Sequence, residues 1–182
     1  KLLSLSCLWG KAMRHPIFPG IKDHPEIIQI ENFGEEYHTN SHWHSDVTFE
    51  NEPPDATLLY SLEIPDIGGD TLFANQYLAY EELDQKSKDQ LSGLSAYHSN
   101  LSILTLVGAD TSLAKRVLHP IFRTHPETNK KALFVTEAFV ESVEGHDQES
   151  SDKILQELYR LAIKENFIYR HKWSKGDLVV WD

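Results

Sequence analysis

The sequence places an imidazole and a carboxylate two residues apart, at His44 and Asp46. On an extended strand, residues i and i+2 point to the same side, so these two side chains could bind one metal ion. Two histidines and one carboxylate form a ligand set that leaves open positions on Fe(II) for a cosubstrate and for oxygen. His44 and Asp46 would supply two of these three ligands. Taken alone, such a pair is more often a surface histidine beside a solvated carboxylate than a metal site.

Short strands dominate the elements that must position this pair. Apolar runs and alternations bounded by turn residues predict strands over residues 26–31, 57–64, 70–74 and 167–173. A hairpin is predicted where residues 119–124 and 131–136 flank a turn at residues 126–129. Many short strands with a few surface helices indicate a mainly β fold with inserted helices, an antiparallel sandwich or jelly roll.

Two helices are predicted between the strands. Residues 79–91 are rich in polar side chains, with Leu83 and Leu91 available for a buried stripe. Residues 151–165 show a clearer apolar stripe at helical spacing, preceded by Ser and Asp residues suited to an N-cap. These helices do not alternate regularly with strands, which disfavours a doubly wound α/β sheet.

The composition narrows the class of protein. The chain has 182 residues, of which 40% are hydrophobic, enough for the core of a single domain. Its formal net charge of −11 makes a nucleic-acid partner unexpected, because the molecule would repel phosphates. No apolar run approaches the roughly 20 residues that span a bilayer, so no membrane partner is expected. The single Cys7 excludes an intrachain disulfide framework and fits a reducing, cytoplasmic location.

Both ends of the sequence look like interior parts of a fold. Residues 1–9 resemble the last turns of a helix closed by Gly10, and residues 176–182 resemble a buried strand. Domain termini usually lie in polar surface segments instead. We therefore expect residues 1–182 to be one domain that is incomplete at both its N- and C-termini.

Six motifs, in order along the chain, carry a resemblance to a known family. They are His15-Pro-Ile-Phe-Pro19, Trp43-His-Ser-Asp-Val-Thr-Phe49, Gly68-Gly-Asp-Thr-Leu72, His119-Pro-Ile-Phe-Arg-Thr-His-Pro126, Lys131-Ala-Leu-Phe134 and Gly176-Asp-Leu-Val-Val-Trp-Asp182. Together the motifs resemble the taurine/alkylsulfatase/2,4-dichlorophenoxyacetate dioxygenase family of Fe(II)- and 2-oxoglutarate-dependent oxygenases. The resemblance implies a double-stranded β-helix, in agreement with the jelly roll expected from the strand pattern.

The resemblance assigns roles to individual residues. It makes His44 and Asp46 the catalytic iron ligands and Thr71 a hydroxyl that binds a 2-oxoglutarate carboxylate; an ordinary strand position is the alternative for Thr71. It also gives five residues of the substrate pocket: His15, Asn40, Val47, Phe49 and Phe139. For the three apolar members, a plain core position is an equal alternative. Phe18 stands where taurine-specific relatives carry a Tyr, which removes a hydroxyl donor.

The implied reaction uses Fe(II), 2-oxoglutarate and O2 to hydroxylate a small organic anion, with release of succinate and CO2. A sulfonate or an alkyl sulfate ester fits the motifs better than an aryloxy acid. The third iron ligand and the arginines that bind the carboxylates are expected after Asp182. Relatives form dimers or tetramers, so a homodimer or homotetramer is expected here. A catalytically silent β-sandwich binding domain is the main alternative, and a mononuclear zinc hydrolase is a weaker one.

The remaining histidines are expected to be structural or exposed. His119 and His125 are interpreted as structural residues of the predicted hairpin, and His171 as a packing residue. The polar surroundings of His24, His38, His98 and His146 are typical of surface loops. The role of His42 is left open.

Overall fold

The computed structural model describes residues 1–31 and 42–182, and strands outnumber α-helices nine to five in these ranges. The strands are β1 (Thr57–Tyr60), β2 (Thr71–Ala74), β3 (Ser95–Ser99), β4 (Arg116–Pro120), β5 (Phe122–Thr124), β6 (Lys131–Leu133), β7 (Val140–Val143), β8 (Ile168–His171) and β9 (Leu178–Trp181). The α-helices are α1 (Leu2–Ser6), α2 (Gln76–Glu82), α3 (Gln85–Leu91), α4 (Leu101–Leu106) and α5 (Gln148–Ala162). Short 3-10 helices are η1 (Cys7–Trp9), η2 (Thr111–Leu113) and η3 (Glu165–Phe167).

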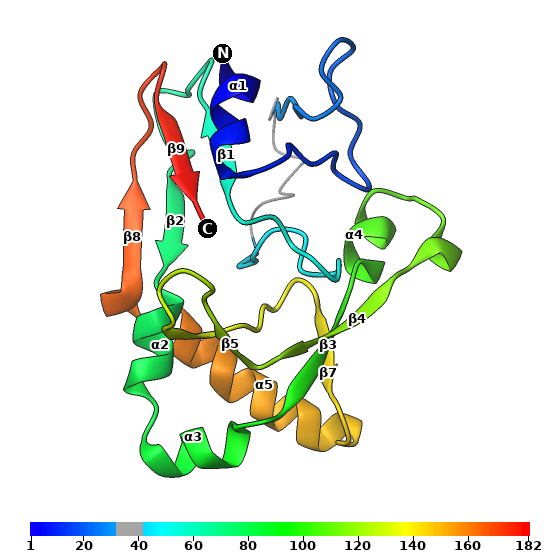
Figure 1. Cartoon of the computed structure of the whole chain (residues 1–182), viewed down its shortest axis with the longest axis vertical. Coiled ribbons are helices and arrows are strands. Elements are labelled where there is room, and N and C mark those ends of the chain that lie inside the picture. The colour runs from blue at the N-terminus through cyan, green and yellow to red at the C-terminus, as the bar shows by residue number, and fades with distance from the viewer. Residues whose placement is uncertain (32–41) are drawn as a thin grey trace.

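All strand pairs in the described ranges are antiparallel. The pairs β1–β9, β2–β8 and β5–β6 form two-stranded sheets, and β4–β3–β7 forms a three-stranded sheet. Two of these pairs join early strands to the last ones, with Thr57 opposite Trp181 and Thr71 opposite His171. Figure 1 shows these two pairs at one end of the molecule and α2, α3 and α5 at the other. The expected mainly β fold with inserted helices is confirmed at this level.

The core consists of two clusters. The larger one lies where α5 packs against β7 and α2, and its buried members are Ala79, Ala96, Ile121, Leu133, Val135, Val143, Leu155, Leu158, Ala162 and Phe167. The smaller one consists of Val47, Phe49 and Phe139, with Ile17, Ile103 and Ala138 packed around it. The smaller cluster lies under the predicted metal-binding motif, so the packing of that cluster positions the motif.

Several predicted elements are confirmed. The hairpin is formed by β5 and β6, with Phe122 opposite Leu133. The predicted strands over 57–64 and 70–74 correspond to β1 and β2, and the helix over 151–165 corresponds to α5. The carboxylate of Asp147 caps α5 by accepting a hydrogen bond from the Ser150 amide at 2.8 Å. None of the helices in the described ranges is long and apolar enough to cross a membrane.

Other predictions were wrong. Residues 26–31 form no strand, and residues 79–91 form the end of α2 and all of α3 instead of one helix. The helix breaks because Asp84 caps a new one, accepting a hydrogen bond from the Ser87 amide at 2.7 Å. The strand β3 was not predicted, because its sequence Ser-Ala-Tyr-His-Ser lacks the usual run of β-branched residues.

Candidate metal and cosubstrate site

His44 presents one defined ring nitrogen to its surroundings. Its Nδ1 lies 2.8 Å from the carbonyl oxygen of His42. A carbonyl only accepts hydrogen bonds, so Nδ1 carries the proton and Nε2 keeps a lone pair in the neutral ring. Metal-binding histidines are oriented by such a bond through their second nitrogen. The carbonyl group of His42, whose role was left open, therefore orients the His44 ring so that Nε2 could accept a metal ion.

Asp46 faces that nitrogen. Its Oδ1 lies 3.4 Å from His44 Nε2. Metal–nitrogen and metal–oxygen bonds of about 2 Å allow two atoms at this separation to share one ion. The other carboxylate oxygen, Oδ2, is buried and has no hydrogen-bond partner among the described residues. Buried polar oxygens almost always have a hydrogen-bond partner. The missing partner of Oδ2 is therefore consistent with a metal ion bound between His44 and Asp46.

Asp46 and His44 each stabilise the charged form of the other. Burial opposes ionisation of Asp46, but the nearby donor groups of His44, Thr57 and Trp181 outweigh it and lower the pKa of the carboxyl group. The hydrogen bond with Asp46 raises the pKa of His44, and burial only partly offsets this effect. Both shifts favour a protonated His44 beside an ionised Asp46. Metal binding displaces such a proton, which makes affinity depend on pH.

The segment that carries the pair is a turn and not the predicted extended strand. Residues 46–49 form a tight turn in which the Glu50 amide donates to the Val47 carbonyl at 3.0 Å. Val47 has a φ of 55°, a left-handed conformation that costs a β-branched residue about 1–3 kcal/mol. His44 and Asp46 still converge, with Nε2 and Oδ1 3.4 Å apart, although neither lies in a strand.

Two buried histidines hold this turn, and one of them corrects a prediction. His98 was expected in a surface loop but is fully buried on β3, with its Nδ1 2.9 Å from Thr48 Oγ1. His119 Nε2 donates to the carbonyl of Glu50 at 3.0 Å. The two rings meet edge to face at 5.1 Å, and both pack against Phe134. The structural role expected for His119 therefore consists of holding the residues after Asp46.

His15, a predicted substrate residue, lies close enough to Asp46 for the two charges to interact. Its Nδ1 accepts hydrogen bonds from the amides of Ile17 and Phe18 at 3.1 and 3.0 Å. The proton of the neutral ring is therefore on Nε2, which can donate to an anion. Burial lowers the pKa of His15, and the charge of Asp46 opposes this only in part. His15 is thus a neutral hydrogen-bond donor near Asp46.

The predicted apolar residues pack around the same position. Phe139 meets the ring of His44 at 6.3 Å and the ring of Phe49 at 5.1 Å, both edge to face. Phe49 is fully buried, and Val47 and Phe139 are less than a tenth exposed. Their packing orients His44 and the turn, whatever contact they make with a substrate. Asn40 lies outside the residues that the structure describes.

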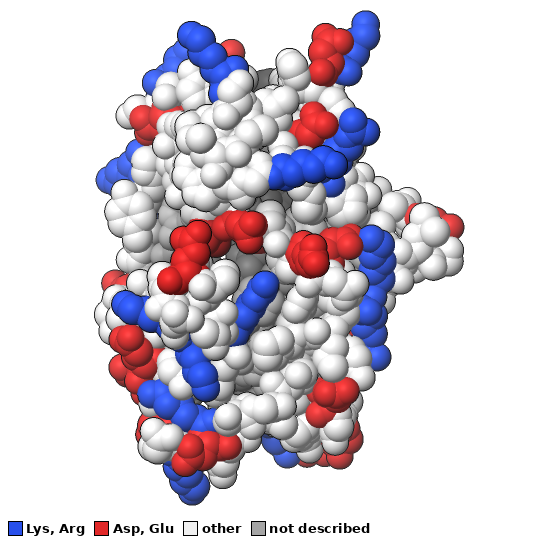
Figure 2. All heavy atoms as spheres, viewed as in Figure 1, with Lys and Arg blue, Asp and Glu red and all other residues white. Residues whose placement is uncertain are grey.

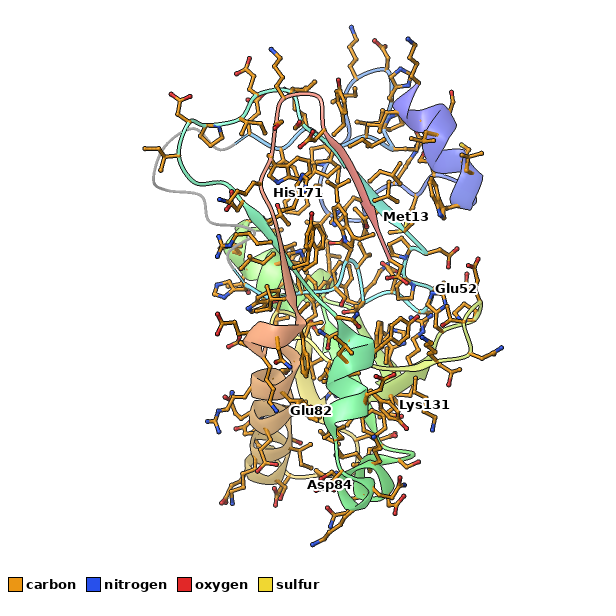
Figure 3. The ribbon with its side chains drawn as sticks, turned by 90° about the vertical axis from the view of Figure 1, so that its left-hand side faces the viewer. Met13, Glu52, Glu82, Asp84, Lys131 and His171 are labelled. Carbon is orange, nitrogen blue, oxygen red and sulfur yellow. The ribbon has the colours of Figure 1, made fainter. Side chains whose placement is uncertain are left out.

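Thr71 begins β2, and its hydroxyl oxygen accepts a hydrogen bond from Trp173 Nε1 at 2.9 Å. Phe73 on the same strand packs against Trp181 at 5.3 Å, and Trp181 in turn lies beside Asp46. Contacts through Phe73 and Trp181 thus link β2, which begins at Thr71, to Asp46. Figure 3 shows His171, which pairs with Thr71, at the end of the molecule that lies away from α2 and α5.

Within residues 1–31 and 42–182, no group of three His, Cys, Asp or Glu side chains could hold a metal ion. His44 and Asp46 thus remain two of the three ligands that the predicted set requires. The other histidines of the described ranges contribute no third ligand at this position.

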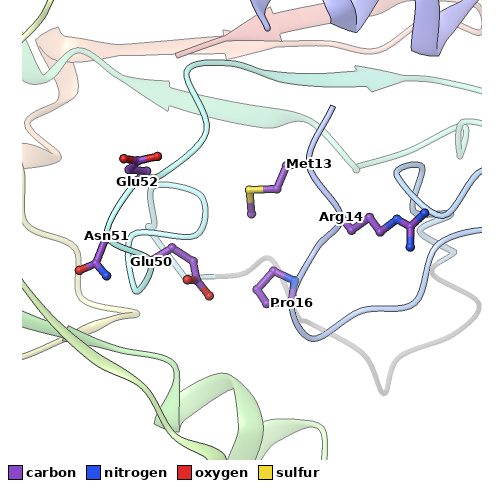
Figure 4. A pocket seen from close by; sticks show the side chains of 6 residues that line it. All are labelled: Met13, Arg14, Pro16, Glu50, Asn51 and Glu52. Atoms are coloured by element: carbon purple, nitrogen blue, oxygen red, sulfur yellow. The ribbon is translucent and has the colours of Figure 1, made fainter. Parts of the chain in front are cut away.

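The structure also contains a cleft of about 530 Å³. Its lining comes from the segment around His15 and from the loop after Phe49, and consists of Met13, Arg14, Pro16, Glu50, Asn51 and Glu52 (Figure 4). Neither His44 nor Asp46 lines it. On the face shown in Figure 2, acidic and basic side chains are interspersed, without a continuous basic surface.

Comparisons with known proteins show similar sequences and similar structures. The sequence profile described as "Taurine catabolism dioxygenase TauD, TfdA family" matches residues 1–182. The alkylsulfatase of Acinetobacter baylyi is 32% identical over 190 residues, covering 96% of this chain and 58% of that protein. The curated relatives are longer: this chain spans between 37% and 62% of their lengths.

Solved structures show the same similarity. The crystal structure of a taurine dioxygenase from Burkholderia xenovorans aligns with a TM-score of 0.77 at 31% identity, over 94% of this chain and 57% of that chain. The structure of AAD-2 in complex with Mn(II) and N-oxalylglycine aligns with a TM-score of 0.71 at 31% identity, over 77% and 57% of the two chains.

Proposed function

Because the chain belongs to the taurine catabolism dioxygenase TauD, TfdA family, we propose that the whole protein is a 2-oxoglutarate-dependent dioxygenase that hydroxylates a small organic anion. The observation that carries this proposal is the pair of His44 Nε2 and Asp46 Oδ1 at 3.4 Å, with a buried and unpaired second carboxylate oxygen. We also infer that the antiparallel sheets belong to a double-stranded β-helix. Pairing of early strands with late ones, as in β1–β9 and β2–β8, supports this architecture.

In this function His44 and Asp46 hold the metal, which we propose is Fe(II). When bound, the metal supplies the activation of oxygen that couples conversion of 2-oxoglutarate to succinate and CO2 with hydroxylation of the substrate. The protein contributes orientation. The His42 carbonyl orients the His44 ring, and Asp46, at the start of the turn at residues 46–49, places its carboxylate 3.4 Å from Nε2. Thr71 binds a carboxylate of 2-oxoglutarate through its hydroxyl group.

His15 contributes to binding of the anionic substrate. Its Nε2–H is the donor of a ring whose Nδ1 is already occupied by two backbone amides. A neutral donor of this kind binds a sulfonate or sulfate oxygen without adding charge beside the metal. We propose a sulfonate or an alkyl sulfate ester as the substrate, because hydroxylation next to the heteroatom gives an adduct that breaks down to an aldehyde and sulfite or sulfate. Phe18 lacks the hydroxyl group of taurine-specific relatives, which favours a substrate other than taurine.

The test is an Asp46→Ala variant of the whole protein. Removal of one of two visible ligands should abolish stoichiometric Fe(II) binding and lower succinate formation from 2-oxoglutarate by at least 100-fold. Asp66→Ala, at an exposed carboxylate, is the matched control and should retain both. Metal content is measured after anaerobic loading, and succinate by chromatography.

Three outcomes would contradict the proposal. Undiminished turnover in Asp46→Ala would remove the carboxylate from the metal site. No metal uptake by the unmodified protein would favour a catalytically silent binding domain. Zinc retained through chelation, without any consumption of 2-oxoglutarate, would favour a hydrolase.

A further inference from the structure

Within the described residues, the hydroxyl group of Thr71 accepts a hydrogen bond but donates none. Its oxygen accepts the hydrogen bond from Trp173 Nε1 at 2.9 Å. An indole N–H is a donor and never an acceptor, so the proton of this hydrogen bond belongs to Trp173. The hydroxyl proton of Thr71 has no acceptor among the described residues. One lone pair of the Thr71 oxygen is therefore occupied by this hydrogen bond, and the hydroxyl proton is available for donation to a ligand.

Trp173 is itself held in place by the loop between β8 and β9. The ring of His171 meets the Trp173 ring at 4.5 Å and 89°. His171 Nε2 lies 3.3 Å from Asp177 Oδ2, and that oxygen also accepts from the Ser174 amide at 2.8 Å. The edge-to-face contact with His171 therefore packs the indole ring within this loop. The indole N–H is directed at the Thr71 hydroxyl oxygen.

We propose that Trp173 is a positioning residue that commits the Thr71 hydroxyl to donating its proton to a carboxylate oxygen of 2-oxoglutarate. This inference rests on the proposed function, in which Thr71 binds that cosubstrate. A threonine hydroxyl can rotate and can either donate or accept. With the indole donor on one side, only the donating arrangement satisfies both groups. A hydroxyl that already accepts a hydrogen bond is also polarised into a stronger donor.

The test is a double-mutant cycle on equilibrium binding of 2-oxoglutarate to the whole protein, loaded with Mn(II) in the absence of oxygen. Trp173→Phe keeps an aromatic ring and removes the N–H, so the dissociation constant should rise by about 3- to 10-fold. Thr71→Val removes the hydroxyl group and should raise it by about 10- to 100-fold, since the lost bond is to a charged group. In the Thr71→Val background, Trp173→Phe should have no further effect, whereas in Thr71→Ser its effect should persist.

Trp9→Phe, a substitution of the same kind in η1, is the control and should leave the dissociation constant unchanged. Binding is measured by titration calorimetry, and the fold of each variant by circular dichroism. If Trp173→Phe does not fold, replacement of Trp173 by its benzothiophene analogue removes the N–H with less change in shape.

The outcomes separate the inference from the function on which it rests. An unmodified protein that binds no 2-oxoglutarate would overturn the proposed function. Normal binding that Thr71→Val weakens and Trp173→Phe does not would overturn only the role of Trp173. Trp173→Phe could also lower the affinity for 2-oxoglutarate equally with and without the Thr71 hydroxyl group. That result would overturn the role of Trp173 as well, because the loss would then come from altered packing. Binding unaffected by Thr71→Val would remove both residues from the cosubstrate site.

Discussion

Neighbouring groups determine whether each polar side chain of the candidate site donates or accepts a hydrogen bond. A carbonyl faces Nδ1 of His44, two amides face Nδ1 of His15, and an indole N–H faces the hydroxyl of Thr71. As a result, His44 offers a lone pair, His15 offers a proton, and Thr71 offers a proton. A metal and two anions are the partners that such a set suits. The agreement among these three side chains supports the proposed metal and anion site more strongly than any one of them does alone.

His98 allows a prediction at the same scale, on stability. Burial, with a smaller effect of the charge of His119, lowers the pKa of His98 to about 3. The unfolded chain then binds more protons than the folded one between pH 6.5 and about 3. Stability must therefore fall as the pH drops through this range. His98 should account for a loss of about 2 kcal/mol in the free energy of unfolding by pH 5.

The measurement is urea unfolding of the unmodified protein and of His98→Asn between pH 7 and pH 5. Asparagine does not titrate, so the stability difference between the two proteins should shrink as the pH falls. His24→Asn, at an exposed histidine, is the control and should leave the pH dependence unchanged. A constant difference between the unmodified protein and His98→Asn would contradict the neutral, buried state of His98.

At the scale of elements, α5 is the main support of the larger core cluster. Its buried residues Ser151, Leu155, Leu158 and Ala162 follow one another at spacings of three or four, so they lie on one face. Ser151 also accepts a hydrogen bond from the Val143 amide at 3.0 Å, which ties α5 to β7. This face was visible in the sequence because helical periodicity is local. The helix could therefore be predicted with nearly the right bounds.

Truncation of this face should be costly. Leu158→Ala should lower the free energy of unfolding by about 2–5 kcal/mol, because Leu158 is 2% exposed and a cavity would remain. Glu157→Ala, one position away on the exposed face, should change it by no more than about 0.5 kcal/mol. Urea denaturation measures both. Similar losses in the two variants would contradict the assignment of the buried face.

At the scale of the whole molecule, the candidate site joins parts that are far apart in the chain. Asp46 lies beside Thr57 and Trp181, and Thr71 is bonded to Trp173. Ligands that bind here should therefore stabilise the entire fold. The net charge of −11 repels anions in general, so local donors such as His15 have to attract the cosubstrate and substrate.

Thermal unfolding tests this coupling. Addition of 2-oxoglutarate at about 100 times its dissociation constant to the protein loaded with Mn(II) should add about 2.7 kcal/mol of stability. For a chain of this size, this gain corresponds to a rise in Tm of about 5–10 °C. A chelator should reverse the shift, and Asp46→Ala should not show it. A shift of equal size in Asp46→Ala would mean that the ligands bind elsewhere.

The sequence by itself determined the features that depend on neighbouring residues: the His44–Asp46 pair, the β5–β6 hairpin, α5, and the six motifs of the family. The tertiary structure decided how these residues are used. It showed that residues 46–49 form a turn, that His98 is buried against Thr48, and that Trp173 donates to Thr71. The reason is separation along the chain. The bond of His98 spans 50 residues and that of Trp173 spans 102, and no local propensity encodes which distant donor will face a given acceptor.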